Sequence, residues 1–590
     1  MSRFAIGDHD FLLDGRPHRI LSGALHYFRT HPGDWADRIA KARRMGLNTI
    51  ETYVAWNAHE PRRGEWSASG TTDLGRFLDL VAEAGMHAIV RPGPYICAEW
   101  HNGGLPAWLT AMPGIGLRRS EPTYLAEVEA YLRRVYEIIG PRQIDLGGNV
   151  VLVQIENEYG AYGADKEYLA ELVRVTKDAG ITVPLTTVDQ PQPQMLRDGS
   201  LRGLHLTGSF GSRAVERLAT LREHQPTGPL MCSEFWCGWF DWWGNTHHTT
   251  SASDSAAELD ALLATGASVN IYMVHGGTNF GLTNGANHKG RYLPLATSYD
   301  YDAPLDEAGD PTAKYFAFRD VIARYAPVAD EPPAPAIARP EVAAPLSVLG
   351  DWRLALPAPT VEGETPPTFE DLGHVGALIE YTAELPAAAF GEESTALLTV
   401  DDAVRDLAWV EVDAVRVGRM SRMRHERSLA IPRGCAISIL VEDLGRVNYG
   451  PRIGEAKGLI GQPRVGGVPL TGWTATPIDV AAIGAALTGD EADGEQATSP
   501  APGPVALRGE FALDAPSDLF LSTDGWAKGY AFVNGFFLGR YWSNGPQRTL
   551  YVPGPATRAG ANVVVFLELE GTAETVARFV PRPDLGPAEE

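Results

Sequence analysis

The chain is poor in cysteine and in positive charge for its length. It has four cysteines among 590 residues, scattered at Cys97, Cys232, Cys237 and Cys435. Four scattered thiols do not make a disulfide framework in a chain this long, so we predict none. Lysine and arginine number 50 against 74 aspartates and glutamates, a net charge of -24. Because so acidic a protein repels phosphate groups and anionic lipids, neither nucleic acid nor a membrane is predicted as a partner.

Long apolar runs are also missing. The longest apolar stretches are the length of a strand, whereas a membrane-spanning helix needs about 20 apolar residues in succession. The first residues, MSRFAIGDHDFLLDG, have no apolar core after a basic start, so we predict no signal peptide. Together with the scarcity of cysteine, these absences favour a location in the cytoplasm.

Strand-like and helix-like stretches alternate over the first 300 residues or so. The apolar, strand-like runs are Arg19 to Leu25, Asn48 to Val54, His87 to Arg91, Val150 to Gln154, Thr182 to Thr187, Leu204 to Thr207, Pro229 to Cys232 and Val269 to Val274. Helix-like stretches between them include Asp34 to Met45, Asp73 to Ala84, Tyr124 to Ile139, Lys166 to Ala179, Arg213 to His224 and Ser253 to Thr265. Eight such alternations predict a (β/α)₈ TIM barrel. An open doubly wound sheet is the alternative, but no glycine-rich phosphate loop follows the first strand, and no cofactor is predicted.

Two stretches rich in proline divide the rest of the chain. ADEPPAPAIARPEVAAP ends the barrel, and TGDEADGEQATSPAPGP interrupts the β-rich part that follows. Alternating runs such as Trp409 to Val417 predict sandwiches on either side of the second stretch. The predicted organisation is a barrel over residues 1–326, a linker over 327–345, a β-sandwich over 346–483, a linker over 484–504 and a second β-sandwich over 505–590.

The stretch from Val150 to Gly160, VVLVQIENEYG, changes abruptly from apolar to acidic. A buried parallel strand is expected to read as a near-continuous apolar run, so acids at its carboxyl end indicate a functional site better than a solvated loop. If the strand pleat continues, Gln154, Glu156 and Glu158 lie on one side. We choose Glu158 as the reactive acid and interpret Glu156 as a hydrogen-bonding strut.

Carboxylates and aromatics recur at the ends of other strands, where barrels carry their chemistry. Glu234 follows the seventh strand, and the segment Glu234 to Gly244, EFWCGWFDWWG, holds four tryptophans, beginning with Trp236. Adjacent His247 and His248 do not have the spacing of metal ligands, so no metal is predicted. Two carboxylates among aromatics suit glycoside hydrolysis, in which one acid protonates the leaving oxygen and one carboxylate attacks or activates water.

Long motifs run through the predicted barrel, namely SGALHYFR (22–29), ETYVAWNAHEP (51–61), RPGPYICAEWHNGGLPAWL (91–109), QIENEYG (154–160), SEFWCGWFDWWG (233–244), HGGTNFGLTNGAN (275–287) and SYDYDAP (298–304). They resemble the motifs of glycoside hydrolase family 35, the retaining β-galactosidases. Beyond the barrel, LVEDLGRVNYG (440–450) and GWAKGYAFVNGFFLGRYWSNGPQRTLYVP (525–553) resemble the family's two jelly-roll, galactose-binding-like domains.

The resemblance implies an exo-acting β-galactosidase that releases terminal galactose from oligosaccharides or glycosides through a galactosyl-enzyme intermediate. It assigns Glu158 as acid/base and Glu234 as nucleophile. The residues that it places around the galactose are Tyr53, Ile96, Cys97, Ala98, Glu99, Asn157 and Tyr301, to which we add Trp236.

Three alternatives and three departures accompany this interpretation. The same mechanism could act on a β-glucosaminide or an α-L-arabinopyranoside, which lacks only the hydroxymethyl group of the galactoside, or the protein could bind sugar without turnover. Cys237, Trp242 and His101 differ from the residues usual in the family, and we expect them to affect the aglycone side.

Overall fold

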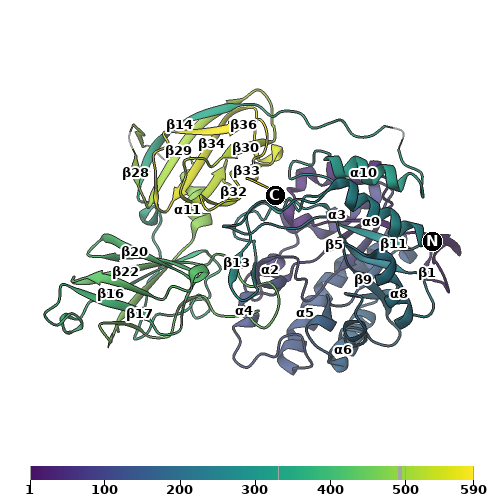
Figure 1. Ribbon diagram of the computed structural model, residues 1–590, viewed down its shortest axis with the longest axis horizontal. Helices are drawn as coiled ribbons and strands as arrows, with labels where there is room; N and C mark the ends of the chain where they lie inside the picture. The colour runs from purple at the N-terminus through teal and green to yellow at the C-terminus, as the bar shows by residue number, and fades with distance from the viewer. Residues whose placement is uncertain (1, 330, 490–493, 499, 589–590) are drawn as a thin grey trace.

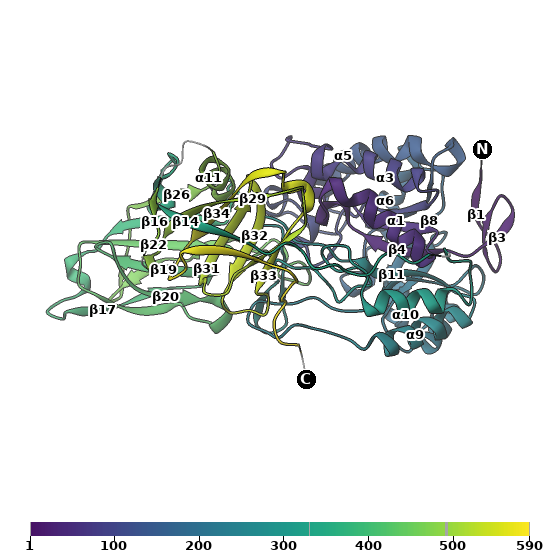
Figure 2. The same ribbon diagram turned by 90° about the horizontal axis from the view of Figure 1, so that it is seen from above.

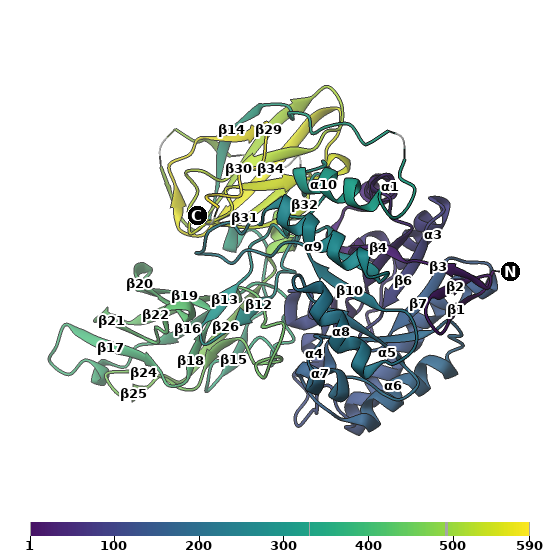
Figure 3. The ribbon, with the colours of Figure 1, turned by 45° about the vertical axis from the view of Figure 1, so that its right-hand side comes forward.

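The computed structural model describes residues 2–329, 331–489, 494–498 and 500–588. A barrel ringed by helices forms one side of the molecule, and two β domains lie next to each other on the other side (Figures 1 and 3). Residues 490–493 and 499 of the predicted second linker lie outside the described part of the chain.

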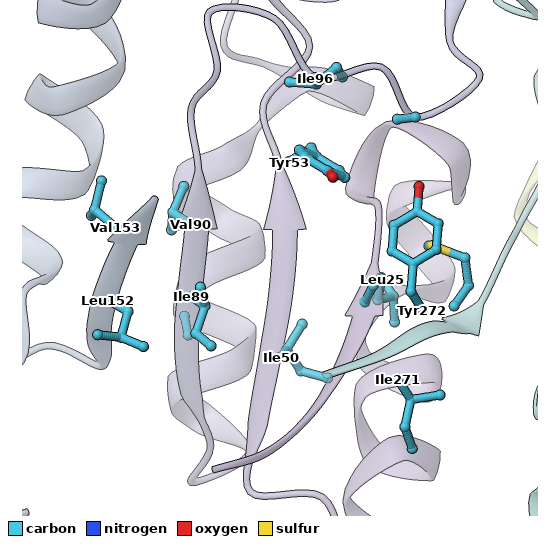
Figure 4. Close-up of a cluster of buried hydrophobic side chains, with 14 of the residues drawn as sticks. Leu25, Ile50, Tyr53, Ile89, Val90, Ile96, Leu152, Val153, Ile271 and Tyr272 are labelled. Atoms are coloured by element: carbon cyan, nitrogen blue, oxygen red, sulfur yellow. The ribbon is translucent and has the colours of Figure 1, made fainter. Parts of the chain in front are cut away.

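Eight parallel strands close the barrel in the order β10-β11-β4-β5-β6-β7-β8-β9, which confirms the TIM barrel over the open sheet. Their side chains are almost all buried, because helices cover the outside and packed side chains fill the interior. Figure 4 shows this interior, with Tyr53 and Tyr272 above the apolar layer. The strands are β4 (Leu21–Leu25), β5 (Thr49–Tyr53), β6 (His87–Arg91), β7 (Val150–Gln154), β8 (Leu185–Asp189), β9 (His205–Ser209), β10 (Met231–Trp236) and β11 (Ser268–His275).

Local sequence signals mark both ends of the barrel helix α3 (Leu74–Glu83). The Asp73 carboxylate caps the first turn by accepting from the Arg76 amide at 2.8 Å. Gly85 follows the helix with a φ of 70°, a conformation that favours glycine. The other barrel helices are α1 (Trp35–Met45), α2 (Trp56–His59), α4 (Ala107–Thr110), α5 (Pro122–Ile139), α6 (Lys166–Asp178), α7 (Pro193–Asp198), α8 (Ala214–His224), α9 (Ala252–Ala264) and α10 (Ala313–Ile322).

A small antiparallel sheet precedes the barrel and lies at the end of the molecule away from the β domains (Figure 2). It consists of β1 (Phe4–Ile6), β2 (Phe11–Leu13) and β3 (Arg16–His18). Within the described residues, no helix is long and apolar enough to cross a membrane.

Two all-β domains follow the barrel, as predicted, but one strand is in a different place from that expected. β14 (Val342–Gly350) pairs with β29 and β36 of the last domain, whereas we assigned its residues to the first linker and the first sandwich. The chain therefore enters the C-terminal sheet before it forms the first β domain, and β14 lies among the last strands in Figure 1. Local sequence could not reveal this, because the pairing joins segments about 150 residues or more apart.

The two β domains are built from antiparallel sheets. The first domain pairs β15 (Val361–Gly363), β26 (Trp473–Ile478), β16 (Leu378–Glu384), β22 (Ala436–Glu442), β19 (Leu407–Val412) and β20 (Val415–Ser421) in one sheet, and β21 (Ser428–Pro432), β17 (Thr395–Val400), β24 (Pro463–Val465) and β25 (Val468–Pro469) in another. With β14, the large sheet of the last domain contains β32 (Phe536–Trp542), β31 (Lys528–Val533), β34 (Gly560–Glu568), β29 (Val505–Leu513), β36 (Val576–Val580), β30 (Leu519–Ser522), β33 (Thr549–Val552) and β27 (Glu495–Gln496).

An apolar cluster joins all three parts of the molecule. Trp243 and Tyr292 from the barrel pack in it with Trp409 of the first β domain and with Phe532 and Trp542 of the last. All five are buried. The burial of this much aromatic surface fixes the β domains against the barrel.

Candidate active site

A cavity of about 440 Å³ opens at the carboxyl ends of the barrel strands. It brings together every predicted site residue except one, namely Tyr53, Cys97, Ala98, Glu99, Asn157, Glu158, Glu234, Trp236 and Tyr301. The exception is Ile96, which is fully buried behind the wall, donates its amide to the Gly103 carbonyl at 2.9 Å, and lies on the loop above the strands in Figure 4.

Glu156 and Glu158 lie on different sides, contrary to the expectation that the pleat continues. β7 ends at Gln154, and both glutamates adopt left-handed conformations with φ of 59° and 44°. The Glu156 carboxylate turns away from the cavity, accepts from Arg118 at 3.0 and 2.8 Å and accepts from Tyr168 at 2.8 Å. Glu156 therefore acts as a buried ion-pair partner, and Glu158 alone of the two lines the cavity.

Glu234 is held on both carboxylate oxygens. Its Oε1 accepts from the Tyr53 hydroxyl and from the Arg91 guanidinium, each at 2.6 Å, and its Oε2 accepts from the Trp236 indole at 3.2 Å. Asn157 joins the group, because its Oδ1 accepts from the Tyr53 hydroxyl at 3.0 Å and from Arg91. A charge-assisted bond from a guanidinium stabilises a carboxylate and fixes its direction. These contacts hold the Glu234 carboxylate in place and fix its direction.

Arg91, which donates to Glu234, is a residue of the site that sequence reasoning missed. It lies at the end of β6 and is 1% exposed, so its charge is compensated entirely within the protein. The signal was present, since Arg91 opens the RPGPYICAEW stretch and a basic residue at the end of a buried strand requires an anionic partner. The sequence does not show which carboxylate that partner is.

Glu158 has the environment of a general acid. Burial, and then the negative charge of Glu234, raise the pKa of Glu158 from its usual 4.5 to about 7. The Ser209 hydroxyl donates to Glu158 Oε1 and partly opposes this rise. A carboxyl group that holds its proton near neutral pH, next to a carboxylate bound by a guanidinium, provides one acid and one nucleophile or base in the same cavity.

The loop after β6 forms another wall. Cys97, Ala98 and Glu99 have successive φ values of 56°, 49° and 50°, a strained left-handed run for residues that are not glycine. Glu99 accepts from the Tyr299 hydroxyl at 2.6 Å, and burial raises the pKa of Glu99 to about 7. The strained run thus places polar groups of this loop against the cavity beside Tyr301.

The first β domain also contributes to the cavity through Tyr449 and Gly450. The preceding residue, Asn448, attaches this loop to the barrel: its carbonyl accepts from the Tyr95 hydroxyl at 2.8 Å, and its Oδ1 accepts from the Asn287 amide at 2.9 Å. The site is therefore complete only when the first β domain is docked on the barrel.

Aromatic and basic groups form the outer part of the cavity. Trp236, Trp239 and Phe240 lie on one side, and Lys289 lies 5.9 Å from the centre of the Trp239 ring. The residues that we expected to affect the aglycone side, Cys237, Trp242 and His101, do not line the cavity. Trp242 reaches it indirectly, since its indole donates at 3.0 Å to Asn287, which does line it.

No group of three or more His, Cys, Asp or Glu side chains is arranged to hold a metal ion in the part of the chain that the structure describes. His247 instead contacts the Asp241 carboxylate at 2.7 Å.

A carboxyl group that is protonated near neutral pH, a carboxylate beside it that is bound by a guanidinium, and a rim of aromatic rings can cleave a glycosidic bond at the carboxyl ends of a TIM barrel. The fold and the site are those of a glycoside hydrolase.

Comparison with known proteins gives the family. The model of "Glycosyl hydrolases family 35" matches residues 10–325, that of "Beta-galactosidase, first all-beta domain" matches 366–479, and that of "Beta-galactosidase, galactose-binding domain" matches 504–562. The protein belongs to glycoside hydrolase family 35 and is a glycoside hydrolase.

Among its relatives are a "Beta-galactosidase" of Bos taurus, 40% identical over 97% of this chain and 92% of the relative, and a "Beta-galactosidase" of Homo sapiens, 38% identical over 98% and 89%. A "Beta-galactosidase-1-like protein" of Mus musculus is 39% identical over 98% of this chain and 91% of the relative.

Proposed function

We propose that the protein is a retaining exo-β-galactosidase that removes terminal β-galactosyl residues from oligosaccharides or glycosides. The observation that carries the proposal is the pairing of Glu158, whose pKa is raised to about 7, with Glu234, which is held by Tyr53 and Arg91. The family and the names of the bovine and human relatives support galactose as the sugar.

In the first step of this mechanism, Glu234 attacks the anomeric carbon while Glu158 gives its proton to the departing oxygen. A galactosyl ester of Glu234 forms, and the aglycone leaves as an alcohol. Glu158, now ionised, takes a proton from water, and the water oxygen displaces Glu234 to release galactose. Glu158 loses its proton in the first step and regains one in the second. Both transfers are efficient only if the pKa of Glu158 lies near the working pH.

The surrounding groups are suited to orient the sugar. Because Asn157 Oδ1 already accepts from Tyr53 and Arg91, its amide nitrogen is the atom available to donate to a sugar hydroxyl. Glu99 can exchange hydrogen bonds with hydroxyls from the opposite wall, and Trp236 offers an aromatic face to the apolar side of a ring.

The test compares nitrophenyl β-galactoside with the β-glucoside, the β-glucosaminide and the α-L-arabinopyranoside. We expect preferential hydrolysis of the galactoside, with the β-anomer of galactose as the first product by NMR. Glu234→Gln should lose at least about 10³-fold in kcat, and Glu158→Gln should keep activity only towards activated leaving groups.

Each other outcome contradicts part of the proposal. A first product of the α-anomer would overturn the retaining mechanism, preference for another glycoside would overturn the substrate, and galactose binding without turnover of any glycoside would indicate a sugar-binding protein. The cytoplasmic location stays a prediction, which fractionation of the source cells would test.

A further inference from the structure

A second, much smaller cavity lies inside the barrel, at the level of the mid-strand residues below the active site. Its volume is about 10 Å³, and its lining includes Glu51 and Arg91 on neighbouring strands and Asn270 on β11. Ile89 and Leu152, which also line it, lie below Tyr53 in Figure 4. Glu51 precedes Tyr53 by two residues on β5, so its side chain enters the same barrel interior one layer deeper.

The polar atoms around this cavity are incompletely paired. Glu51 Oε2 accepts from the Asn270 amide at 2.9 Å. Within the described residues, Glu51 Oε1, Arg91 Nε and Asn270 Oδ1 are buried and have no hydrogen-bond partner. Arg91 Nε lies 3.7 Å from Glu51 Oε1, too far for a direct hydrogen bond.

One water molecule fits both the volume of this cavity and the polar atoms that line it. A buried water needs roughly 10–15 Å³ and two to four polar partners. Here a donor, Arg91 Nε, and two acceptors, Glu51 Oε1 and Asn270 Oδ1, are available within a cavity of about 10 Å³. Leaving all three atoms without partners would cost free energy that a single water recovers.

We propose that this cavity binds one water molecule linking Glu51 to Arg91, and that Glu51 is thereby a positioning residue for the nucleophile. The inference rests on the proposed role of Glu234. Arg91 connects the two carboxylates, since its Nη2 donates to Glu234 at 2.6 Å while its Nε faces Glu51. The Tyr53 ring lies 4.1 Å from the centre of the guanidinium and limits its movement on that side.

The charge of Glu51 has a second effect on Glu234. Arg91 interacts with two carboxylates, Glu234 and Glu51. The attraction of Arg91 to either carboxylate is weakened by the presence of the other. Neutralising Glu51 would remove one of the two charges that fix the position of the guanidinium, and it would strengthen the attraction of Arg91 to Glu234. Both changes slow attack by Glu234, the first by misplacing the oxygen and the second by making it a poorer nucleophile.

The test measures nucleophilic attack alone, in the full chain. The probe is 2,4-dinitrophenyl 2-deoxy-2-fluoro-β-galactoside, whose leaving group needs no proton and which traps the glycosyl ester. Glu51→Gln keeps the side-chain volume and removes the charge. Glu307→Gln is the matched control, because Glu307 is also buried but pairs with Thr278 at 2.7 Å. The assay runs at pH 8, since burial raises the pKa of Glu51 to about 7 and the carboxylate is ionised above that value.

We expect Glu51→Gln to slow the inactivation rate constant by about 10- to 100-fold and to change the dissociation constant of the probe by less than about twofold. Glu307→Gln should react like the wild type. If Glu51→Gln reacts as fast as the wild type, or if binding and rate fall together, the positioning role is wrong. If the wild type forms no adduct at Glu234, it is the proposed function that fails.

A crystal structure of the wild type tests the water independently of any variant. Electron density for one water within hydrogen-bond distance of Glu51 Oε1 and Arg91 Nε is expected. An empty cavity at a resolution of about 1.8 Å would overturn the proposed bridge, even if Glu51→Gln did not fold.

Discussion

Replacing Glu158 by glutamine is expected to abolish efficient catalysis and to stabilise the protein at alkaline pH. The pKa of Glu158 rises from its usual 4.5 to about 7 on folding, because burial and the charge of Glu234 disfavour the ionised form. The folded state therefore binds this proton more tightly than the unfolded state. The stabilisation from the proton is complete below pH 4.5 and is lost as pH rises through 7.

The size of the effect follows from that difference. A change from 4.5 to about 7 corresponds to about 3 kcal/mol at most. Glu158 borders the cavity and is partly exposed to it, so water screens part of the cost and we expect about 2 kcal/mol. Glutamine is neutral at every pH and avoids this cost. At roughly 2 °C per kcal/mol for a domain of this size, Glu158→Gln should raise the melting temperature by about 4 °C at pH 8.

The assay measures the melting temperature of the wild type and of Glu158→Gln between pH 5 and pH 8.5. The signal monitored is the unfolding transition of the barrel. The gain from Glu158→Gln should be small at pH 5, should grow as pH rises towards 7 and should level off above that value. Glu156→Gln serves as a control at a neighbouring residue, where we expect destabilisation instead of stabilisation. It leaves the buried Arg118 without its anion, so it should lower the unfolding free energy by about 3–5 kcal/mol at every pH in this range. A gain that is absent at pH 8, or equal at pH 5 and pH 8, would refute the reasoning.

Three further predictions concern the same site. The kcat/KM of the wild type should fall as pH rises through about 7, because Glu158 must be protonated to act as the acid; a profile that stays flat to pH 9 would contradict its role. Tyr53→Phe removes a 2.6 Å hydrogen bond to Glu234 and should lower kcat by about 10-fold with little change in KM, measured by steady-state kinetics. Arg118→Met leaves the Glu156 carboxylate buried without its cation and should lower the unfolding free energy by about 3–5 kcal/mol, which denaturant unfolding would detect; an unchanged midpoint would show that the pair does not matter.

The barrel could be predicted because its strands are continuous apolar runs separated by amphipathic helices. Val150 to Gln154, for example, was predicted as a strand with the bounds that the structure has. β14 could not be predicted in its place, because its pairing with β29 and β36 depends on segments far along the chain. A strand's own residues favour an extended conformation and do not specify the neighbour.

In the site, too, the sequence predicts some features and not others. Glu158 and Glu234 could be chosen because polar residues directly after buried strands must gather at one end of a barrel. The turn of Glu156 away from the cavity depends on the left-handed backbone angles at Glu156 and Glu158 and on Arg118, and neither follows from the alternation of a strand. Cys237, Trp242 and His101 were expected to affect the aglycone side, yet none of them lines the cavity.

The sequence by itself determined the family and the barrel and singled out two carboxylates that line the cavity, because motifs and apolar periodicity are local properties of the chain. Only the tertiary structure decided which groups act on those carboxylates: Arg91 on Glu234, and the domain contact that brings Tyr449 to the cavity. The physical reason is that pKa values, orientation and the shape of the cavity arise from contacts between distant segments, whose energies depend on distance and burial rather than on order in the chain.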